Sequence, residues 1–310
     1  MKTKKVLLLL ICSIYFLASC TSNENKNNEK GDTVNISDSN PTVSLFENTD
    51  DKKHIEPGKD EIKKSLNEIN LTEYFQGIEG CAVIYDEIKN EYLIHNPKLS
   101  EKRVSPCSTF KIVSTLIGLK SKTLEDENTI LEWNGMHYPT EEWNQNLTLK
   151  QAFQVSCIWY FREVIDKSGE EFIQQTLSAL SYGNCDTSQW AGNNVNTGYN
   201  ELNGFWLESS LLISPREQVD TMLSLFNHNA KMYKDFTPTI KKIMEIDNSL
   251  SNTKIYGKTG TGTEKAWFVG FFEKESQPYY YAILLYDSNS DNISGQKAKE
   301  ITLNIIENYF

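Results

Sequence analysis

The chain is poor in the residues that build metal sites and disulfide frameworks. It has 4 histidines and 6 cysteines in 310 residues, and none of them stands in a C-x-x-C, H-x-H or H-E-x-x-H spacing. Zinc sites are usually recognisable in a sequence by such spacings. Domains that depend on disulfides to fold are typically small and secreted. We therefore expect neither a metal site nor a disulfide-stapled miniprotein.

Positive charge is also scarce. The 31 Lys and Arg residues are outnumbered by 42 Asp and Glu residues, which gives a formal net charge of -11. A nucleic-acid-binding protein uses a basic surface to displace counterions, so this balance argues against nucleic acid as a partner. A hydrophobic content of 39% is ordinary for a globular protein and excludes disorder of the whole chain.

The longest apolar run lies at the N-terminus. Three lysines precede residues 6–17, and the run leads into Leu-Ala-Ser-Cys at residues 17–20. This pattern predicts an export signal rather than a spanning helix. Its end resembles the bacterial lipobox, in which the cysteine is lipidated and becomes the mature N-terminus. We predict a signal peptide over 1–20 and an exported lipoprotein attached to a membrane through Cys20; a plain signal peptide is the alternative.

Residues 21–58 differ in composition from everything that follows. They are rich in Asn, Ser, Asp, Glu and Lys and poor in apolar residues. Such a segment cannot bury enough surface to offset its chain entropy. We predict that it is a flexible tether holding one catalytic domain, residues 59–310, outside the cytoplasm and away from the membrane.

The domain begins and ends with strand patterns and has helical patterns between them. The apolar spacing predicts helices over 61–71, 105–119, 149–167, 169–181, 214–227 and 294–309, and strands over 80–85, 91–95, 254–256, 266–272 and 279–286. This order predicts an α+β fold. Its antiparallel sheet is completed by both chain ends and flanked by terminal helices, with a mostly helical middle subdomain.

Ser108 and Lys111 form an S-x-x-K motif inside one of these helical runs. A spacing of three residues places both side chains on one face of a helix. A serine hydroxyl needs a neighbour to take its proton, and a lysine can do so only when burial has made it uncharged. The tetrapeptide alone is common, and a solvent-facing pair is its ordinary explanation.

A second motif changes this interpretation. Lys258-Thr259-Gly260 follows about 150 residues later in a strand-like run, and the pair of motifs in this order resembles penicillin-binding proteins and serine β-lactamases. A strand lysine beside the nucleophile would attract the carboxylate of a β-lactam, and glycine lets the backbone approach the ligand. The resemblance implies an oxyanion hole made by the backbone N–H groups of Ser108 and Thr261.

Further segments resemble the class D, or oxacillinase-type, β-lactamases over about residues 64–310. They are Pro-Cys-Ser-Thr-Phe-Lys-Ile at 106–112, Ser-Cys-Ile-Trp-Tyr at 156–160, Tyr-Gly-Asn at 182–184, Phe-Trp-Leu-Glu at 205–208 and Ala-Trp-Phe-Val-Gly at 266–270. This resemblance implies that β-lactam antibiotics are hydrolysed through a Ser108 acyl-enzyme with carbamylated Lys111 (N6-carboxylysine) as general base. Ser156 would pass a proton to the departing nitrogen, and Trp206 would hold the carbamate.

The same resemblance implies no metal or organic cofactor, only carbon dioxide or bicarbonate for the carbamate, whose formation an apolar Ile158 favours. One feature departs from the family: no arginine follows Arg216, where class D enzymes usually carry one that holds the substrate carboxylate. Lys297 is the expected substitute, as a point charge. A β-lactam sensor that acylates without turnover and a D,D-peptidase are the alternative functions. Substrate spectrum and oligomeric state stay open.

Overall fold

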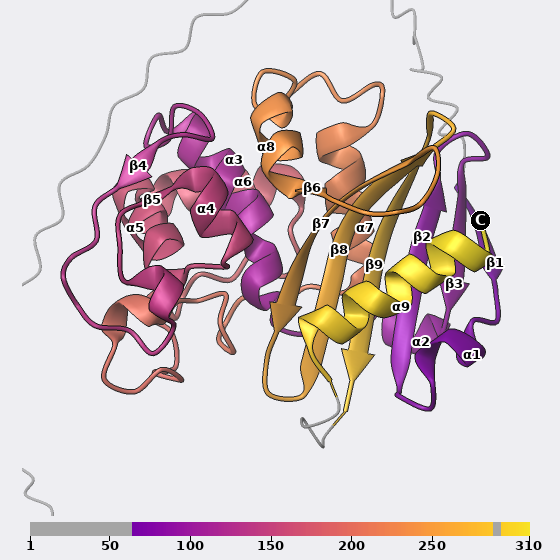
Figure 1. Ribbon diagram of the computed structural model, residues 1–310, viewed down its shortest axis with the longest axis horizontal. Coiled ribbons are helices and arrows are strands. Elements are labelled where there is room, and N and C mark those ends of the chain that lie inside the picture. Colours follow the sequence, from indigo (N-terminus) through magenta and orange to yellow (C-terminus); the bar gives the residue numbers. More distant parts are fainter. Residues whose placement is uncertain (1–63, 288–292) are drawn as a thin grey trace, which may run out of the picture. The chain divides into compact units, whose positions relative to one another are not determined.

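A seven-stranded sheet is the frame of the fold in the computed structural model, which describes residues 64–287 and 293–310 (Figure 1). The predicted signal peptide, Cys20 and the tether lie outside the described residues. The strand order is β1 (Ser65–Glu68), β3 (Glu91–His95), β2 (Gly80–Asp86), β9 (Gln277–Tyr286), β8 (Lys265–Lys274), β7 (Thr253–Thr261) and β6 (Glu245–Ile246).

Both ends of the domain contribute to this sheet, as the sequence predicts. The early strand β2 pairs antiparallel with the late strand β9, from Gly80 opposite Leu285 to Asp86 opposite Tyr279. Only β1 runs parallel to its neighbour, β3. The predicted α+β class with a sheet completed by both chain ends is confirmed.

The sheet has a hydrophobic layer on each face because side chains alternate along its buried strands. On β8, Phe268 and Phe272 belong to the cluster that packs under α9 (Gly295–Asn308), whereas Trp267 and Val269 belong to the larger cluster shared with the other helices. Figure 1 shows α9 crossing the front of the sheet and α7 behind it. The KTG strand β7 thus lies between two packed layers.

The middle of the chain is mostly helical, again as predicted. Its helices are α2 (Pro97–Ser100), α3 (Lys111–Lys120), α4 (Leu149–Gln154), α5 (Ile158–Ser168), α6 (Glu170–Leu180), α7 (Pro215–Phe226) and α8 (Thr237–Met244), with 3-10 turns at Cys107–Phe110, Glu141–Trp143 and Asn200–Leu202 and a small hairpin of β4 (Ile130–Leu131) and β5 (Leu147–Thr148). In Figure 1 most of them gather beside β7, on the left. This side of β7 is where the catalytic motifs meet.

Two predicted helices are wrong in part. The segment expected as a helix over 61–71 contains strand β1, whose backbone joins the edge of β3, and the short helix α1 (Thr72–Phe75) follows it. An available strand edge outweighs a weak local helix preference. The run expected over 149–167 is interrupted at Ser156, which takes a left-handed conformation with φ of 56° and separates α4 from α5.

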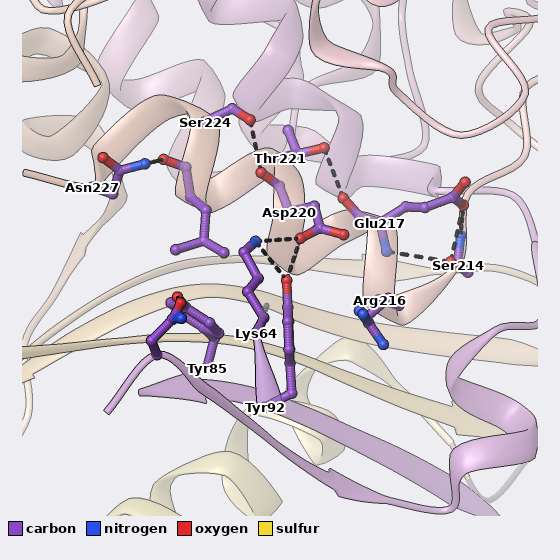
Figure 2. Close-up of polar contacts among 12 residues, drawn as sticks. Lys64, Tyr85, Tyr92, Ser214, Arg216, Glu217, Asp220, Thr221, Ser224 and Asn227 are labelled. Carbon is purple, nitrogen blue, oxygen red and sulfur yellow. Dashed lines mark hydrogen bonds and ion pairs between the residues drawn. The ribbon is translucent and has the colours of Figure 1, made fainter. Parts of the chain in front are cut away.

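Polar contacts fasten the β1–β3 edge of the sheet to α7 (Figure 2). The Lys64 ammonium donates to the Tyr92 hydroxyl at 2.9 Å and pairs with Asp220 at 3.2 Å, and the Tyr92 hydroxyl itself donates to Asp220. The Arg216 guanidinium lies 4.1 Å from the centre of the Tyr92 ring. Burial and the Asp220 charge raise the pKa of Tyr92, which keeps the hydroxyl protonated as a donor.

In residues 64–287 and 293–310, no helix is long and apolar enough to cross a membrane.

Candidate active site

Ser108 and Lys111 are brought together at the start of a buried helix. Ser108 lies in the 3-10 turn Cys107–Phe110, which runs directly into α3, and the Lys111 ammonium is 2.9 Å from the Ser108 hydroxyl oxygen. Lys111 is fully buried, whereas Ser108 is partly exposed and so accessible to a substrate. The predicted contact between nucleophile and base is present.

The surroundings of Lys111 favour its neutral form. Burial lowers the pKa of the Lys111 ammonium to about 8, although the nearby thiols of Cys157 and Cys107 act weakly in the opposite direction. The Phe161 ring lies 5.6 Å from the nitrogen and adds no hydrogen-bond acceptor there. A large fraction of the amine is therefore uncharged near pH 8 and able to accept a proton or to react with carbon dioxide.

The KTG motif lies on β7 against the nucleophile turn. At Gly260 a side chain would have its Cβ 3.1 Å from both the Pro106 carbonyl oxygen and a methyl carbon of Thr109, so glycine permits this close approach. Lys258 is buried, and its ammonium donates to the Thr259 carbonyl at 3.0 Å. Burial, with Lys111 nearby, lowers the pKa of Lys258 well below its ordinary value. Thr261 ends the strand beside the turn that carries Ser108.

Trp206 adjoins the same turn and has an unused hydrogen-bond donor. Its carbonyl oxygen accepts from the Cys107 amide at 3.1 Å and from the Ser105 hydroxyl at 2.8 Å, and its ring centre lies 5.6 Å from that of Phe110. The indole N–H is buried and has no acceptor among the described residues. A buried donor without a partner is costly, so this site favours a ligand or a modification that supplies an acceptor.

Ser156 and Ile158 lie at the break between α4 and α5. Ser156 is partly exposed, and its hydroxyl makes no hydrogen bond within the described part of the chain. Its left-handed backbone is a strained conformation of the kind that clusters at functional sites. Ile158 begins α5, which packs on α3, and its apolar side chain contacts the core. Their predicted catalytic roles stay predictions.

Other residues of the class D-like motifs contribute to the packing of the fold. Cys107 and Cys157 are free thiols and behave as small buried hydrophobic side chains. The Tyr-Gly-Asn element is structural: Gly183 has a φ of 56°, and a Cβ there would lie 2.0 Å from the Leu212 carbonyl oxygen. Asn184 then bonds the Leu212 amide at 2.9 Å. Within the described ranges, no cluster of His, Cys, Asp and Glu has the arrangement of a metal site.

The structure does not bring Lys297 to the site. Its ammonium donates to Gln76 at 2.9 Å and lies 3.9 Å from the carboxylate of Glu300, which corrects the expectation that it replaces the missing arginine. The direction of the Lys297 side chain is set by the rotation of α9 about its axis. This helix buries a stripe that includes Gly295 and Ala298 against the sheet. Lys297 leaves the helix on the side of this stripe that faces away from β7.

Lys299, which the sequence analysis did not single out, leaves α9 on the other side of the buried stripe. A cleft of about 300 Å³ beside β7 is lined by Lys258, Thr259, Gln296 and Lys299 and by two acidic residues, Glu245 and Asp247. Ser108 is not part of this lining, so the cleft adjoins the KTG strand rather than the nucleophile. Lys299 follows Gly295 by four residues, and Gly295 packs against Thr259, so the spacing places Lys299 near the KTG strand. In the described residues its ammonium has no ion-pair partner. The spacing of four residues between Gly295 and Lys299 was the feature of the sequence that could have predicted this position.

A serine and a lysine in contact, beside a glycine-bearing strand with its own buried lysine, define a serine acyl-transfer site of the penicillin-recognising type. A model of the penicillin-binding protein transpeptidase domain matches residues 80–307. The chain belongs to this family, and the resemblance to class D β-lactamases is confirmed by the comparisons that follow.

The relatives include enzymes and a receptor. The chain is 33% identical over 259 residues to the probable β-lactamase YbxI of Bacillus subtilis, covering 83% of this chain and 90% of that protein. A class D β-lactamase structure from Bacillus subtilis matches with a TM-score of 0.68 at 34% identity, covering 78% of this chain and 95% of that one. The C-terminal domain of the BlaR penicillin receptor of Bacillus licheniformis matches with a TM-score of 0.70 at 27% identity, covering 80% and 97%.

Proposed function

We propose that this protein is a class D serine β-lactamase that hydrolyses β-lactam antibiotics with Ser108 as nucleophile and carbamylated Lys111 as general base. Two observations carry the proposal: Lys111 is buried with a lowered pKa, and the Trp206 indole N–H is a buried donor without a partner among the described residues. A neutral amine reacts with carbon dioxide, and Trp206 offers the donor that a carbamate oxygen needs. The residues therefore fit the modification.

The proposed reaction assigns one step to each of these residues. The Ser108 oxygen attacks the lactam carbonyl carbon, the ring C–N bond breaks, and Ser156 passes a proton to the departing nitrogen. Backbone N–H groups of Ser108 and Thr261 stabilise the oxyanion. Carbamylation would convert Lys111 into a carboxylate-like base. This base first accepts the Ser108 proton during acylation and later accepts a proton from the water that attacks the acyl-enzyme. Hydrolysis of the ester by that water frees Ser108.

The receptor-like function is the second candidate, because the BlaR domain shares this fold. A receptor stays acylated, whereas an enzyme turns over. Apolar Ile158 favours turnover, since a polar side chain there would compete for the carbamate. The transpeptidase-domain match is compatible with a D,D-peptidase, but the relatives reported above are a probable β-lactamase, a class D β-lactamase structure and a penicillin receptor.

Turnover separates these candidates directly. We expect purified protein, mixed with a chromogenic cephalosporin in excess and with bicarbonate present, to hydrolyse many equivalents at a steady rate. A single burst of one equivalent, followed by a stable adduct in the mass spectrum, would instead identify a receptor-like domain.

Substrate anchoring is proposed for Lys258 and Lys299, which line one cleft. A bound carboxylate would favour the charged form of Lys258 and so oppose the effect of burial on its pKa. Lys299→Ala should raise the KM for a penicillin about fivefold with little change in kcat, because a partly exposed charge contributes roughly 1 kcal/mol to ground-state binding. Lys297→Ala is the matched control on the same helix and should leave KM unchanged. Steady-state kinetics on a penicillin and on its methyl ester test this, since the ester lacks the carboxylate and should not distinguish the variants. Equal KM values for Lys299→Ala and the unaltered protein would exclude the role.

Membrane attachment through lipidated Cys20 remains part of the proposal. Cys20→Ala should move the protein from the membrane fraction to the soluble fraction, because the acyl chains are the expected source of membrane affinity. Fractionation of expressing cells, with radioactive palmitate labelling of both forms, provides the measurement. Unchanged membrane retention of the variant would assign the anchor to the apolar run 6–17 instead.

A further inference from the structure

Glu208 occupies an unusual position two residues after Trp206. Its backbone φ is 49°, a left-handed conformation that residues other than glycine rarely adopt. The side chain is largely buried, with 22% of its surface exposed, and its carboxylate lies 2.5 Å from the Lys265 ammonium. Backbone strain of this kind persists only where the surrounding contacts hold it.

The carboxylate joins two segments that flank the proposed oxyanion hole. One oxygen accepts from the Thr263 amide at 3.0 Å, and the Cys107 thiol lies 3.8 Å from the same oxygen. Cys107 directly precedes Ser108, and Thr263 follows Thr261 by two residues. Glu208 therefore bridges the chain positions beside both proposed oxyanion donors.

The turn between β7 and β8 is shaped around this carboxylate. A Cβ at Gly262 would lie 1.9 Å from a Glu208 carboxylate oxygen, so the turn has room for the carboxylate only because residue 262 is glycine. The Gly262 amide donates to the Lys265 carbonyl at 2.8 Å, which closes the turn. The backbone amide of Glu208 donates to the Ser105 hydroxyl at 3.0 Å, which also ties Glu208 to the segment before Ser108.

We propose that Glu208 is a positioning residue for acylation: its ion pair with Lys265 and its bond to Thr263 set the spacing between the Ser108 and Thr261 amides that bind the oxyanion. This inference rests on the proposed function and adds a residue to its machinery. A purely stabilising role is a weaker account, because partly buried ion pairs contribute little net stability while the left-handed backbone has a cost.

The test measures acylation and oxyanion hydrogen bonding in the full-length protein. Glu208→Ala should slow single-turnover acylation by a penicillin about tenfold or more, since displaced oxyanion donors lose transition-state stabilisation. The infrared stretch of the acyl-enzyme carbonyl should move to higher frequency, because weaker hydrogen bonds polarise the carbonyl less. For Glu208→Gln, the acylation rate and the carbonyl stretch should lie between those of the unaltered protein and Glu208→Ala, because the Gln amide oxygen can still accept from the Thr263 amide.

Glu273→Gln is the matched control. Glu273 is likewise a partly buried carboxylate in an ion pair: it is 29% exposed and pairs with Lys241 at 2.6 Å, but it lies at the end of β8 opposite Lys265. It should leave the acylation rate and the carbonyl stretch unchanged. Should Glu208→Ala fail to fold, Lys265→Met tests the same ion pair and should show the same two changes.

Two different results would overturn the inference. Normal acylation and an unshifted carbonyl stretch in Glu208→Ala or Lys265→Met, with a working unaltered protein, would overturn the role of Glu208 alone. Absence of any acyl-enzyme in the unaltered protein would overturn the proposed function and this inference together.

Discussion

Ser108→Ala should abolish formation of the covalent β-lactam adduct. The Ser108 hydroxyl is partly exposed and is the hydrogen-bond partner of the Lys111 nitrogen, so its removal deletes the proposed nucleophile from an otherwise complete site. We expect the acylation rate to fall by about 10⁴-fold or more. Intact-protein mass spectrometry after exposure to a slowly hydrolysed β-lactam measures the adduct.

The fold should survive this change. Loss of one hydrogen bond to Lys111 should alter the free energy of unfolding by about 1 kcal/mol, because net contributions of single hydrogen bonds are of this size. Ser224→Ala on α7 is the control, since the Ser224 hydroxyl donates to the Asp220 carbonyl within the same helix. Thermal unfolding of both variants should resemble that of the unaltered protein. An adduct on a folded Ser108→Ala variant would contradict the assignment of the nucleophile.

Activity should depend on carbon dioxide, and more strongly as the pH falls. The pKa of Lys111 is lowered to about 8, so the reactive neutral amine predominates above this pH and is lost by protonation below it. Near pH 6, only about 1% of the amine is neutral, because this lies two units below the pKa. We expect activity in carbon-dioxide-free buffer to fall by at least about tenfold there and to recover on addition of bicarbonate.

Labelled bicarbonate and Trp206 variants make this test specific. Carbon-13 NMR with labelled bicarbonate should show a carbamate signal that disappears in Lys111→Ala. Trp206→Phe retains a ring but lacks the indole donor, so it should need about 10 to 100 times more bicarbonate for half activity, as expected when a hydrogen bond to a charged group is lost. Equal rates at every bicarbonate level, with no carbamate signal, would place the protein outside the class D mechanism.

The residues of the proposed catalytic motifs could be found from the sequence because each motif consists of a few residues at short, fixed spacings. A serine and a lysine three residues apart on a helix share a face, and the structure places the Lys111 nitrogen 2.9 Å from the Ser108 hydroxyl oxygen. The hairpin 80–95 and the three late strands are also recognisable from alternation and turn residues. The helix predicted for residues 65–68 was wrong, because pairing with the exposed edge of β3 decided the conformation of this segment.

The sequence by itself determined the family, the α+β class, the contact between the proposed nucleophile and its lysine, and the KTG strand, because each depends on short-range spacing and side-chain chemistry. Only the tertiary structure decided which α9 lysine lies at the cleft, and it selected Lys299 over Lys297. It alone joined Glu208 to Lys265 at the start of β8 and left the Trp206 indole without a partner among the described residues. These outcomes depend on how distant segments pack and on the rotational phase that packing imposes on a helix, neither of which local spacing specifies.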